Sequence, residues 1–158
     1  MGYLVSIGIS AGIIAAIFIQ YAAVMNVVSW ISFVSMASFY AAGGKNEGFI
    51  KGGAANLSGV FWAMFIFQGA QFIASEYSLA IMVFIAVVAM CAQAKINILS
   101  FIPGTFCGAA CVFGTNGNWQ VVVTALILGS VMGWLSEQGG LIIFKAISKQ
   151  SMENDAST

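Results

Sequence analysis

The stretch YLVSIGISAGIIAAIFIQYAAVM, from Tyr3 to Met25, runs for 23 residues without a charged side chain. Because a helix rises 1.5 Å per residue, about 20 apolar residues cross the roughly 30 Å hydrocarbon core of a bilayer. The strands of a membrane β-barrel are shorter and alternate between apolar and polar residues, which this stretch does not do. The stretch therefore predicts a membrane-spanning α-helix.

The whole chain of 158 residues shares this character, with 61% hydrophobic and only 6% charged residues. A soluble domain averages roughly 45–50% apolar and about 25% charged residues, because it needs a wettable surface. The composition therefore indicates an integral membrane protein in contact with lipid. Five acids balance five lysines, so the net charge gives no indication of a nucleic-acid partner, and we expect none.

Polar residues divide the chain into six apolar segments. They run from Tyr3 to Met25, Asn26 to Ala42, Phe49 to Ala74, Tyr77 to Ala94, Ile96 to Phe113 and Trp119 to Phe144. The pattern predicts an all-α membrane protein with six transmembrane helices, of which the second and fifth are short or broken. Residues 1–147 are expected to form one transmembrane domain, and residues 148–158 a polar, disordered cytoplasmic tail.

The lysines support an even number of crossings. With six helices, the loops after the second and fourth segments and the C-terminal region lie on one side, together with the N-terminus. These regions hold all five lysines, Lys45, Lys51, Lys95, Lys145 and Lys149. The positive-inside rule makes that side cytoplasmic, so both termini are expected in the cytoplasm.

The two halves of the chain resemble one another. A register of about 71 or 72 residues aligns the first three segments with the last three, with the same long-short-long order. The matching pairs are Asn26 with Asn97, Ser29 with Ser100, Ser58 with Ser130 and Trp62 with Trp134. Three crossings per repeat would give the halves opposite orientations, which predicts an inverted repeat of residues 1–74 and 75–147.

The two short segments are the first candidates for a solute site, because short or interrupted helices at matching positions mark such sites in inverted-repeat transporters. Freed backbone carbonyls are expected at Pro103, which cannot donate to the preceding turn. The alternative interpretation is that these hydroxyls only let helices pack closely. The candidate lining residues are Ser32, Phe33 and Ser35 in the second segment and Asn97, Ser100, Phe101, Pro103 and Thr105 in the fifth.

Three polar residues of the long segments are further candidates. Asn56 and Gln68 carry amides that need partners in a membrane and are candidate lining residues. Glu137 is buried if the last helix continues to Phe144, and an ionisable group at depth suggests function. It lies at the interface if Gly139-Gly140 ends that helix, in which case Leu141 to Lys149 forms a surface helix.

The sequence offers little support for a catalytic or metal-binding site. The chain has no His and no Arg, so no nucleophile–base pair, metal site or cofactor site is expected. Cys107 and Cys111 share a helix face, but two thiols without further ligands are typical of packing. We expect no enzyme. Small-xxx-small pairs, such as Gly8 with Gly12, favour a homo-oligomer.

Four motifs carry a family resemblance: SWISFVSMASFYAAGG (Ser29 to Gly44), NLSGVFWAM (Asn56 to Met64), LSFIPGTFCGAA (Leu99 to Ala110) and LILGSVMGWLSE (Leu126 to Glu137). They resemble the YcdZ-like family of small bacterial inner-membrane proteins, a family of unknown function, over the chain except its tail. The resemblance implies a multi-pass protein of the bacterial inner membrane without known catalytic residues.

These observations favour a channel or facilitator for a small, mostly uncharged polar solute. Six short helices leave a narrow interior, and the scarcity of buried carboxylates argues against proton coupling. The alternative is a non-transporting structural or regulatory subunit of a membrane assembly, although the short loops offer it little recognition surface.

Overall fold

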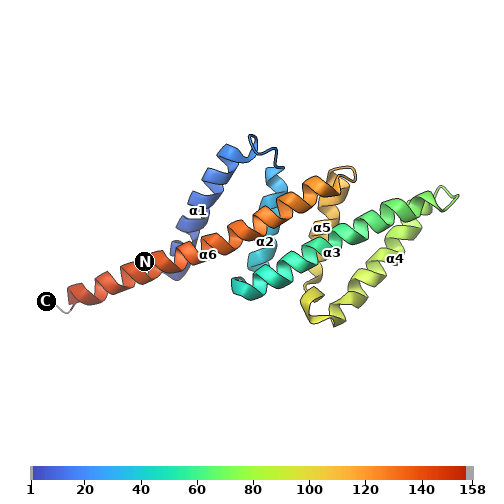
Figure 1. Cartoon of the computed structure of the whole chain (residues 1–158). Helices are drawn as coiled ribbons and strands as arrows, with labels where there is room; N and C mark the ends of the chain where they lie inside the picture. The colour runs from blue at the N-terminus through green and yellow to red at the C-terminus, as the bar shows by residue number, and fades with distance from the viewer. Residues whose placement is uncertain (1, 156–158) are drawn as a thin grey trace.

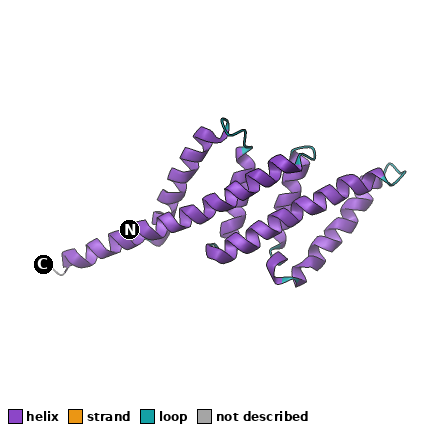
Figure 2. Cartoon of the chain, viewed as in Figure 1, coloured by secondary structure: helices purple, strands orange, loops and turns teal. Residues whose placement is uncertain are grey.

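The computed structural model describes residues 2–155, which fold into α-helices and two short 3₁₀ turns with no strand among them (Figures 1 and 2). The helices are α1 (Tyr3–Ala22), α2 (Ser29–Ala41), α3 (Lys45–Gln71), α4 (Ser78–Ala92), α5 (Ile102–Gly114) and α6 (Trp119–Asp155), and the 3₁₀ turns η1 (Gln93–Lys95) and η2 (Asn97–Leu99) join α4 to α5. The all-α prediction is confirmed.

Four of the described helical stretches are long and apolar enough to cross a membrane: Tyr3–Ala22, Lys45–Gln71, Ser78–Lys95 and Trp119–Lys149. Helices α2 and α5 have 13 residues each, or about 20 Å of helix, which is less than the segments predicted for them. Residues 23–28 form a turn before α2, with Asn26 at a positive φ of 54°. The η2 turn similarly delays the start of α5.

Pro103 does not break a helix at depth, contrary to the sequence prediction. It lies in the first turn of α5, where a backbone N–H has no intrahelical partner in any case. Proline there starts a helix and frees no carbonyl within it. The interruption of the fifth segment therefore lies before Pro103, in residues 93–101.

The short helices α2 and α5 cross the two long, tilted helices α3 and α6, which also pack against each other (Figure 1). Helix α2 packs mainly against α6, and α5 packs mainly against α3, so each short helix contacts the long helix of the other half of the chain. Helix α1 lies along α6, and α4 lies along α3. The two halves are therefore interlocked.

Glycines allow this interlocking, because they bring backbones into direct contact. A Cβ on Gly59 of α3 would overlap the carbonyl oxygen of Thr105 in α5, and one on Gly108 would overlap that of Asn56. On the other side, a Cβ on Gly129 of α6 would overlap the carbonyl of Ser32 in α2. Such close approach is how membrane helices gain van der Waals contact without a hydrophobic driving force.

Helix α6 continues through Gly139-Gly140, so the predicted alternative of a helix end there is wrong. The two glycines serve the contact with α1: a Cβ on Gly140 would overlap the backbone of Ile7, and one on Gly139 would overlap the Ser10 hydroxyl. The helix extends to Asp155, so residues 148–155 of the predicted disordered tail are helical. No Gly or Pro follows Gly140 to stop the helix, and residues 156–158 of the predicted tail lie outside the described part.

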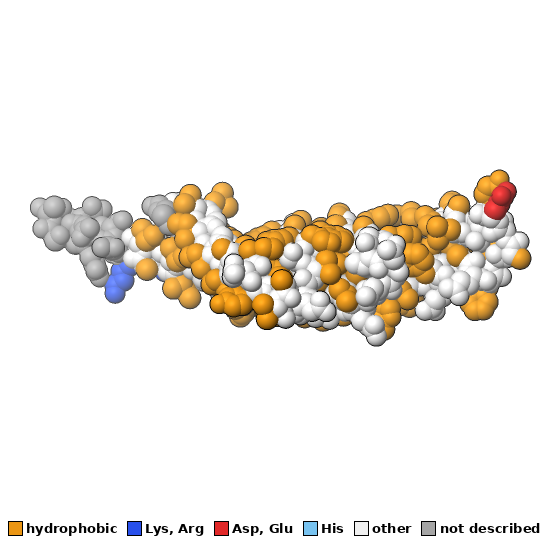
Figure 3. All heavy atoms as spheres, turned by 90° about the horizontal axis from the view of Figure 1, so that it is seen from above, with side chains coloured by type: hydrophobic (Ala, Val, Ile, Leu, Met, Phe, Trp, Pro, Cys, Tyr) orange, Lys and Arg blue, Asp and Glu red, His pale blue; other side chains and the backbone are white. Residues whose placement is uncertain are grey.

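The body is elongated, and the face seen in Figure 3 is mostly apolar, with charged side chains toward its two ends. Many large apolar side chains are exposed on the helices, among them Leu4, Phe61, Phe84 and Ile142. This surface suits a lipid environment. The buried core is small and is made of residues such as Ile31, Val112, Val122 and Leu126, from α2, α5 and α6.

The glycine contacts predict a position-dependent cost of adding one methyl group to α3. We expect Gly59→Ala to lower the free energy of unfolding by about 1–3 kcal/mol through overpacking against α5. Gly53→Ala is the matched control on the same helix, because a Cβ there meets only the Ser130 hydroxyl, at 3.7 Å. SDS titration of the purified variants in mixed micelles measures both values, and equal values would contradict the packing role of Gly59.

Two asparagines that flank α5 test whether this short helix crosses the membrane. Asn97 lies before α5 and Asn116 after it, and the two ends of α5 lie at the lower and upper edges of the bundle in Figure 1. With the three native cysteines replaced by alanine, we expect Asn116→Cys to react with an impermeant maleimide in intact cells, and Asn97→Cys only after lysis. Reaction of both from outside would show that α5 does not cross.

Candidate functional site

The serine stripe of α2 faces α6 and is buried. Ser32 Oγ donates a hydrogen bond to the carbonyl oxygen of Ala125 at 2.9 Å, and Ser35 Oγ donates to that of Leu126 at 2.6 Å. Both serines are fully buried. Because a hydroxyl in the membrane interior needs a partner within the protein, these two bonds fix α2 against α6.

Ser35 is also the centre of a group of three polar side chains from α2, α3 and α6. Its Oγ lies 2.9 Å from Ser130 Oγ, and Asn56 Nδ2 donates to it at 3.2 Å. We call Ser35, Asn56 and Ser130 the central polar cluster. Asn56 is fully buried, and its Oδ1 has no hydrogen-bond partner. The cluster therefore holds an unused acceptor in the interior of the bundle.

A second polar group surrounds Gln93, at the end of α4. Its Oε1 accepts hydrogen bonds from Ser58 Oγ and Trp62 Nε1, both at 2.8 Å, and its Nε2 donates to Thr105 Oγ1 at 2.9 Å. The amide thus joins α3, the end of α4 and α5. Unlike Asn56, Gln93 has bonds at both of its polar atoms and serves as a structural link.

Glu137 is buried within the protein, with 5% of its surface exposed. Its Oε2 accepts a hydrogen bond from the backbone N–H of Lys45, at the start of α3. Gly44 leaves room for this carboxylate, because a Cβ there would lie 3.1 Å from Oε2. A carboxylate at a helix N-terminus satisfies a free N–H and interacts favourably with the helix dipole. Glu137 therefore ties α6 to the turn between α2 and α3.

The structure gathers only some of the predicted lining residues. Ser32, Ser35, Asn56 and Thr105 are buried, but Thr105 hydrogen-bonds to Gln93 rather than to a member of the central polar cluster. Phe33 is 38% exposed and packs edge-on against Phe18 of α1, so it narrows no interior space.

The remaining predicted residues lie at the margins of the bundle. Phe101 packs over Gly104 at the start of α5, and Ser100 Oγ donates to the carbonyl of Asn97 at 2.7 Å. Gln68, Asn97, Ser100 and Pro103 are exposed. The sequence prediction that Ser100 and Ser35 line one space differs from the structure, because Ser100 precedes α5 and lies outside its buried face.

Sequence reasoning passed over Ser130 and Gln93 as site residues. Ser130 could have been found, since the predicted repeat register aligns it with Ser58. Gln93 gives no such signal, because only the turn after α4 directs its amide toward α3 and α5.

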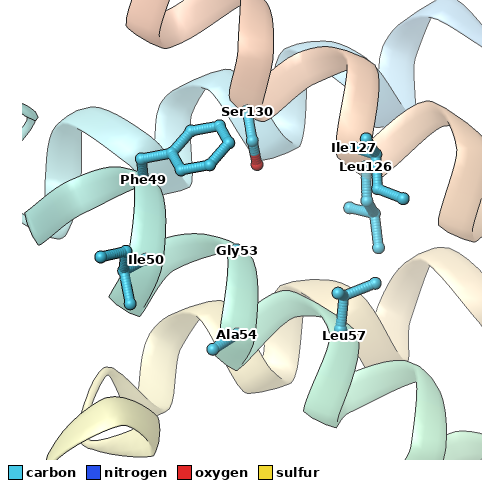
Figure 4. Close-up of a pocket in the computed structure, with 8 residues that line it drawn as sticks. All are labelled: Phe49, Ile50, Gly53, Ala54, Leu57, Leu126, Ile127 and Ser130. Carbon is cyan, nitrogen blue, oxygen red and sulfur yellow. The ribbon is translucent and has the colours of Figure 1, made fainter. Parts of the chain in front are cut away.

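A groove of about 290 Å³ lies beside the cluster, between α3 and α6 (Figure 4). Its walls are Phe49, Ile50, Gly53, Ala54 and Leu57 from α3 and Leu126, Ile127 and Ser130 from α6. Ser130 supplies its one polar side chain, so the groove leads from an apolar surface to a member of the cluster.

Comparison with known proteins places this chain among similar membrane proteins. It is 37% identical over 144 residues to the inner membrane protein YcdZ of Escherichia coli strain K12, covering 89% of this chain and 88% of that protein. It is 35% identical to the inner membrane protein YcdZ of Salmonella typhimurium strain LT2, with 89% of each covered. An uncharacterized Escherichia coli protein, YahC, is 35% identical over 156 residues, which are 92% of this chain and 93% of that protein.

No solved structure matches this chain. Residues 8–141, which include the central polar cluster, Gln93 and Glu137, match the family model described as a protein of unknown function, DUF1097. Because this match and the relatives cover most of its length, the chain belongs to the DUF1097 family.

Proposed function

We propose that this protein is an inner-membrane facilitator for a small, uncharged polar solute, which binds at the central polar cluster. The observation that carries the proposal is the unpartnered Oδ1 of the fully buried Asn56. A buried acceptor without a partner costs about 1–3 kcal/mol, and apolar side chains would serve packing equally well. A transient partner that donates a hydrogen bond gives this atom a role.

The glycine contacts support an inverted repeat. Gly59 approaches the carbonyl of Thr105, and Gly129 approaches the carbonyl of Ser32. Gly59 and Gly129 lie 70 residues apart and Ser32 and Thr105 lie 73 apart, both close to the predicted register of 71 or 72, so the two contacts have similar places in the two halves. Solute sites of inverted-repeat transporters lie at the interface of the repeats, where Ser35 and Asn56 belong to one half and Ser130 to the other.

The cluster is buried, so passage of a solute requires α3 and α6 to separate. Ser130 belongs both to the cluster and to the groove between these helices. The solute would therefore reach the cluster through the contact between α3 and α6. This mechanism requires no covalent chemistry. The solute exchanges its hydrogen bonds with water for hydrogen bonds with the central polar cluster.

The relatives named as inner membrane proteins support the same location for this chain. We place six crossings in that membrane, with both termini in the cytoplasm. The ends of the helices that carry Lys45, Lys51 and Lys95 lie along one edge of the bundle (Figure 1), which fits the positive-inside rule.

A second candidate is a non-transporting subunit of a membrane assembly. It is favoured by the hydrogen bonds that Ser32, Thr105 and Gln93 already make within the chain, since bonded side chains offer little to a solute. Under this alternative the central polar cluster fixes the fold, and the exposed apolar helices bind another membrane protein.

We also propose that the protein is a homo-oligomer, associated through α1. The glycine pairs of α5 and α6 are used inside the bundle, whereas a Cβ on Gly8 or Gly12 would meet nothing within 4 Å. This small-xxx-small face of α1 is therefore open, and such faces let a second membrane helix approach closely.

The flux prediction uses Asn56→Leu, which keeps the side-chain size but removes the acceptor. In proteoliposomes we expect it to reduce the uptake of urea, acetamide or glycerol, whichever the native protein carries, by tenfold or more. Folding should persist, because the substitution removes the unpartnered Oδ1 and a single hydrogen bond to Ser35 Oγ, which keeps its bonds to Leu126 and Ser130. Stopped-flow light scattering measures the uptake.

Asn97→Leu is the matched control, because that amide is exposed and lies outside the cluster, and it should leave uptake unchanged. If the native protein carries none of the three solutes faster than empty liposomes, the facilitator proposal fails. The subunit alternative then predicts that photo-crosslinkers on exposed helix faces capture another membrane protein in cells.

The oligomer prediction concerns the open face of α1. We expect Gly12→Ile to shift the protein to a lower oligomeric state, because the branched side chain keeps two helices apart. Ile13→Val, on an exposed neighbouring position, should leave it unchanged. Light scattering of the detergent complex measures the mass, and a native monomer would contradict the proposal.

A further inference from the structure

The groove between α3 and α6 ends at the hydroxyl of Ser130. The hydrogen bonds of its neighbour Ser35 determine whether this hydroxyl donates or accepts. Ser35 Oγ has one hydrogen and gives it to the carbonyl of Leu126, 2.6 Å away. Its 2.9 Å bond with Ser130 Oγ must therefore use the hydrogen of Ser130. Ser35 also accepts from Asn56 Nδ2, which fills its two acceptor positions.

This assignment leaves Ser130 as an acceptor. Its one hydrogen points to Ser35, and no hydrogen bond among the described residues uses its lone pairs. Figure 4 shows the Ser130 oxygen directed into the space between α3 and α6. Gly53 lies opposite and keeps this space open, since a Cβ there would lie 3.7 Å from Ser130 Oγ.

The remaining walls determine the rest of the ligand. Phe49, Ile50 and Leu57 on α3 face Leu126 and Ile127 on α6, and none of them carries a charge or a hydrogen-bonding side chain. A charged ligand would lose its hydration here without a counter-charge. A volume of about 290 Å³ lies at the small end of ligand pockets, which span about 300–1,000 Å³.

We propose that this groove is a binding site for a small, neutral amphiphilic molecule, whose O–H or N–H donates to Ser130 Oγ while its apolar body lies between α3 and α6. The site opens toward lipid, so the ligand enters from the membrane. A lipid acyl chain also fits the apolar walls, but it has no hydrogen-bond donor. The requirement for a donor therefore distinguishes the proposed ligand from lipid. The inference extends the proposed function by giving the cluster a lateral entrance and a ligand class.

The test uses a matched pair of photoreactive probes, a trifluoromethyl-diazirinyl benzyl alcohol and its methyl ether, with the full-length protein in proteoliposomes. The two probes share an apolar body, but only the alcohol can donate a hydrogen bond. We expect the alcohol to label residues 49–57 and 126–130 about three- to tenfold more than the ether at equal membrane concentration, the difference that one hydrogen bond supplies. Mass spectrometry of peptides measures the labelling.

Four variants test whether the effect depends on Ser130 and on the space beside it. Ser130→Ala should lower labelling by the alcohol to the level of the ether, and Ser130→Thr, which keeps a hydroxyl, should restore the difference. Ser32→Ala is the control, because it removes a buried α2 hydroxyl that bonds to α6 outside the groove. Gly53→Val should reduce labelling of the groove by both probes, because it fills the space beside Ser130.

Equal labelling by the alcohol and the ether would overturn the proposal and indicate that the groove binds lipid acyl chains. Labelling outside residues 49–57 and 126–130 would overturn it as well. Binding is measured without a solute gradient, so this result is independent of flux. A protein that binds the alcohol at Ser130 but carries no solute keeps this inference and loses the proposed function.

Discussion

The structure depends on one constraint: a polar group buried among membrane helices must find its partner within the chain, because lipid offers none. Ser32 and Ser35 meet this constraint by bonding to backbone carbonyls of α6, and Gln93 meets it with three side chains from α3 and α5. Glu137 meets it with an N–H at the start of α3. These bonds join segments that are far apart in sequence.

Glycine makes such bonds possible, since hydroxyl-to-carbonyl contacts between helices require close backbones. Gly129 lets α6 approach α2 where Ser32 and Ser35 bond to it, and Gly59 and Gly108 do the same between α3 and α5. Hydrogen bonding and small-residue packing therefore support each other. The buried apolar core is small: its main cluster lies where α2 and α5 meet the long helices, and a smaller one lies between α3 and α4.

Against this background, the central polar cluster differs from the other polar groups. Every polar atom of the Gln93 amide is bonded, whereas Asn56 keeps an unpartnered oxygen and Ser130 keeps unused lone pairs beside a groove. Both unused groups are acceptors, so both favour a ligand that donates hydrogen bonds. A cluster that only fixed the fold would gain nothing from acceptors without partners.

The sequence by itself determined the class of protein, the helical segments and the shortness of the second and fifth helices. Composition and hydropathy fix these features, because they depend on the exchange of side chains between water and lipid. Gly139-Gly140 shows where local reasoning failed. Glycine can end a helix or allow a neighbouring helix to pack closely, and the contact with α1 shows that these two glycines do the latter. The tertiary structure likewise decided the burial of Glu137, the bonds of Gln93 and the meeting of Ser130 with Ser35, since each joins residues of separate helices whose relative position no local pattern encodes.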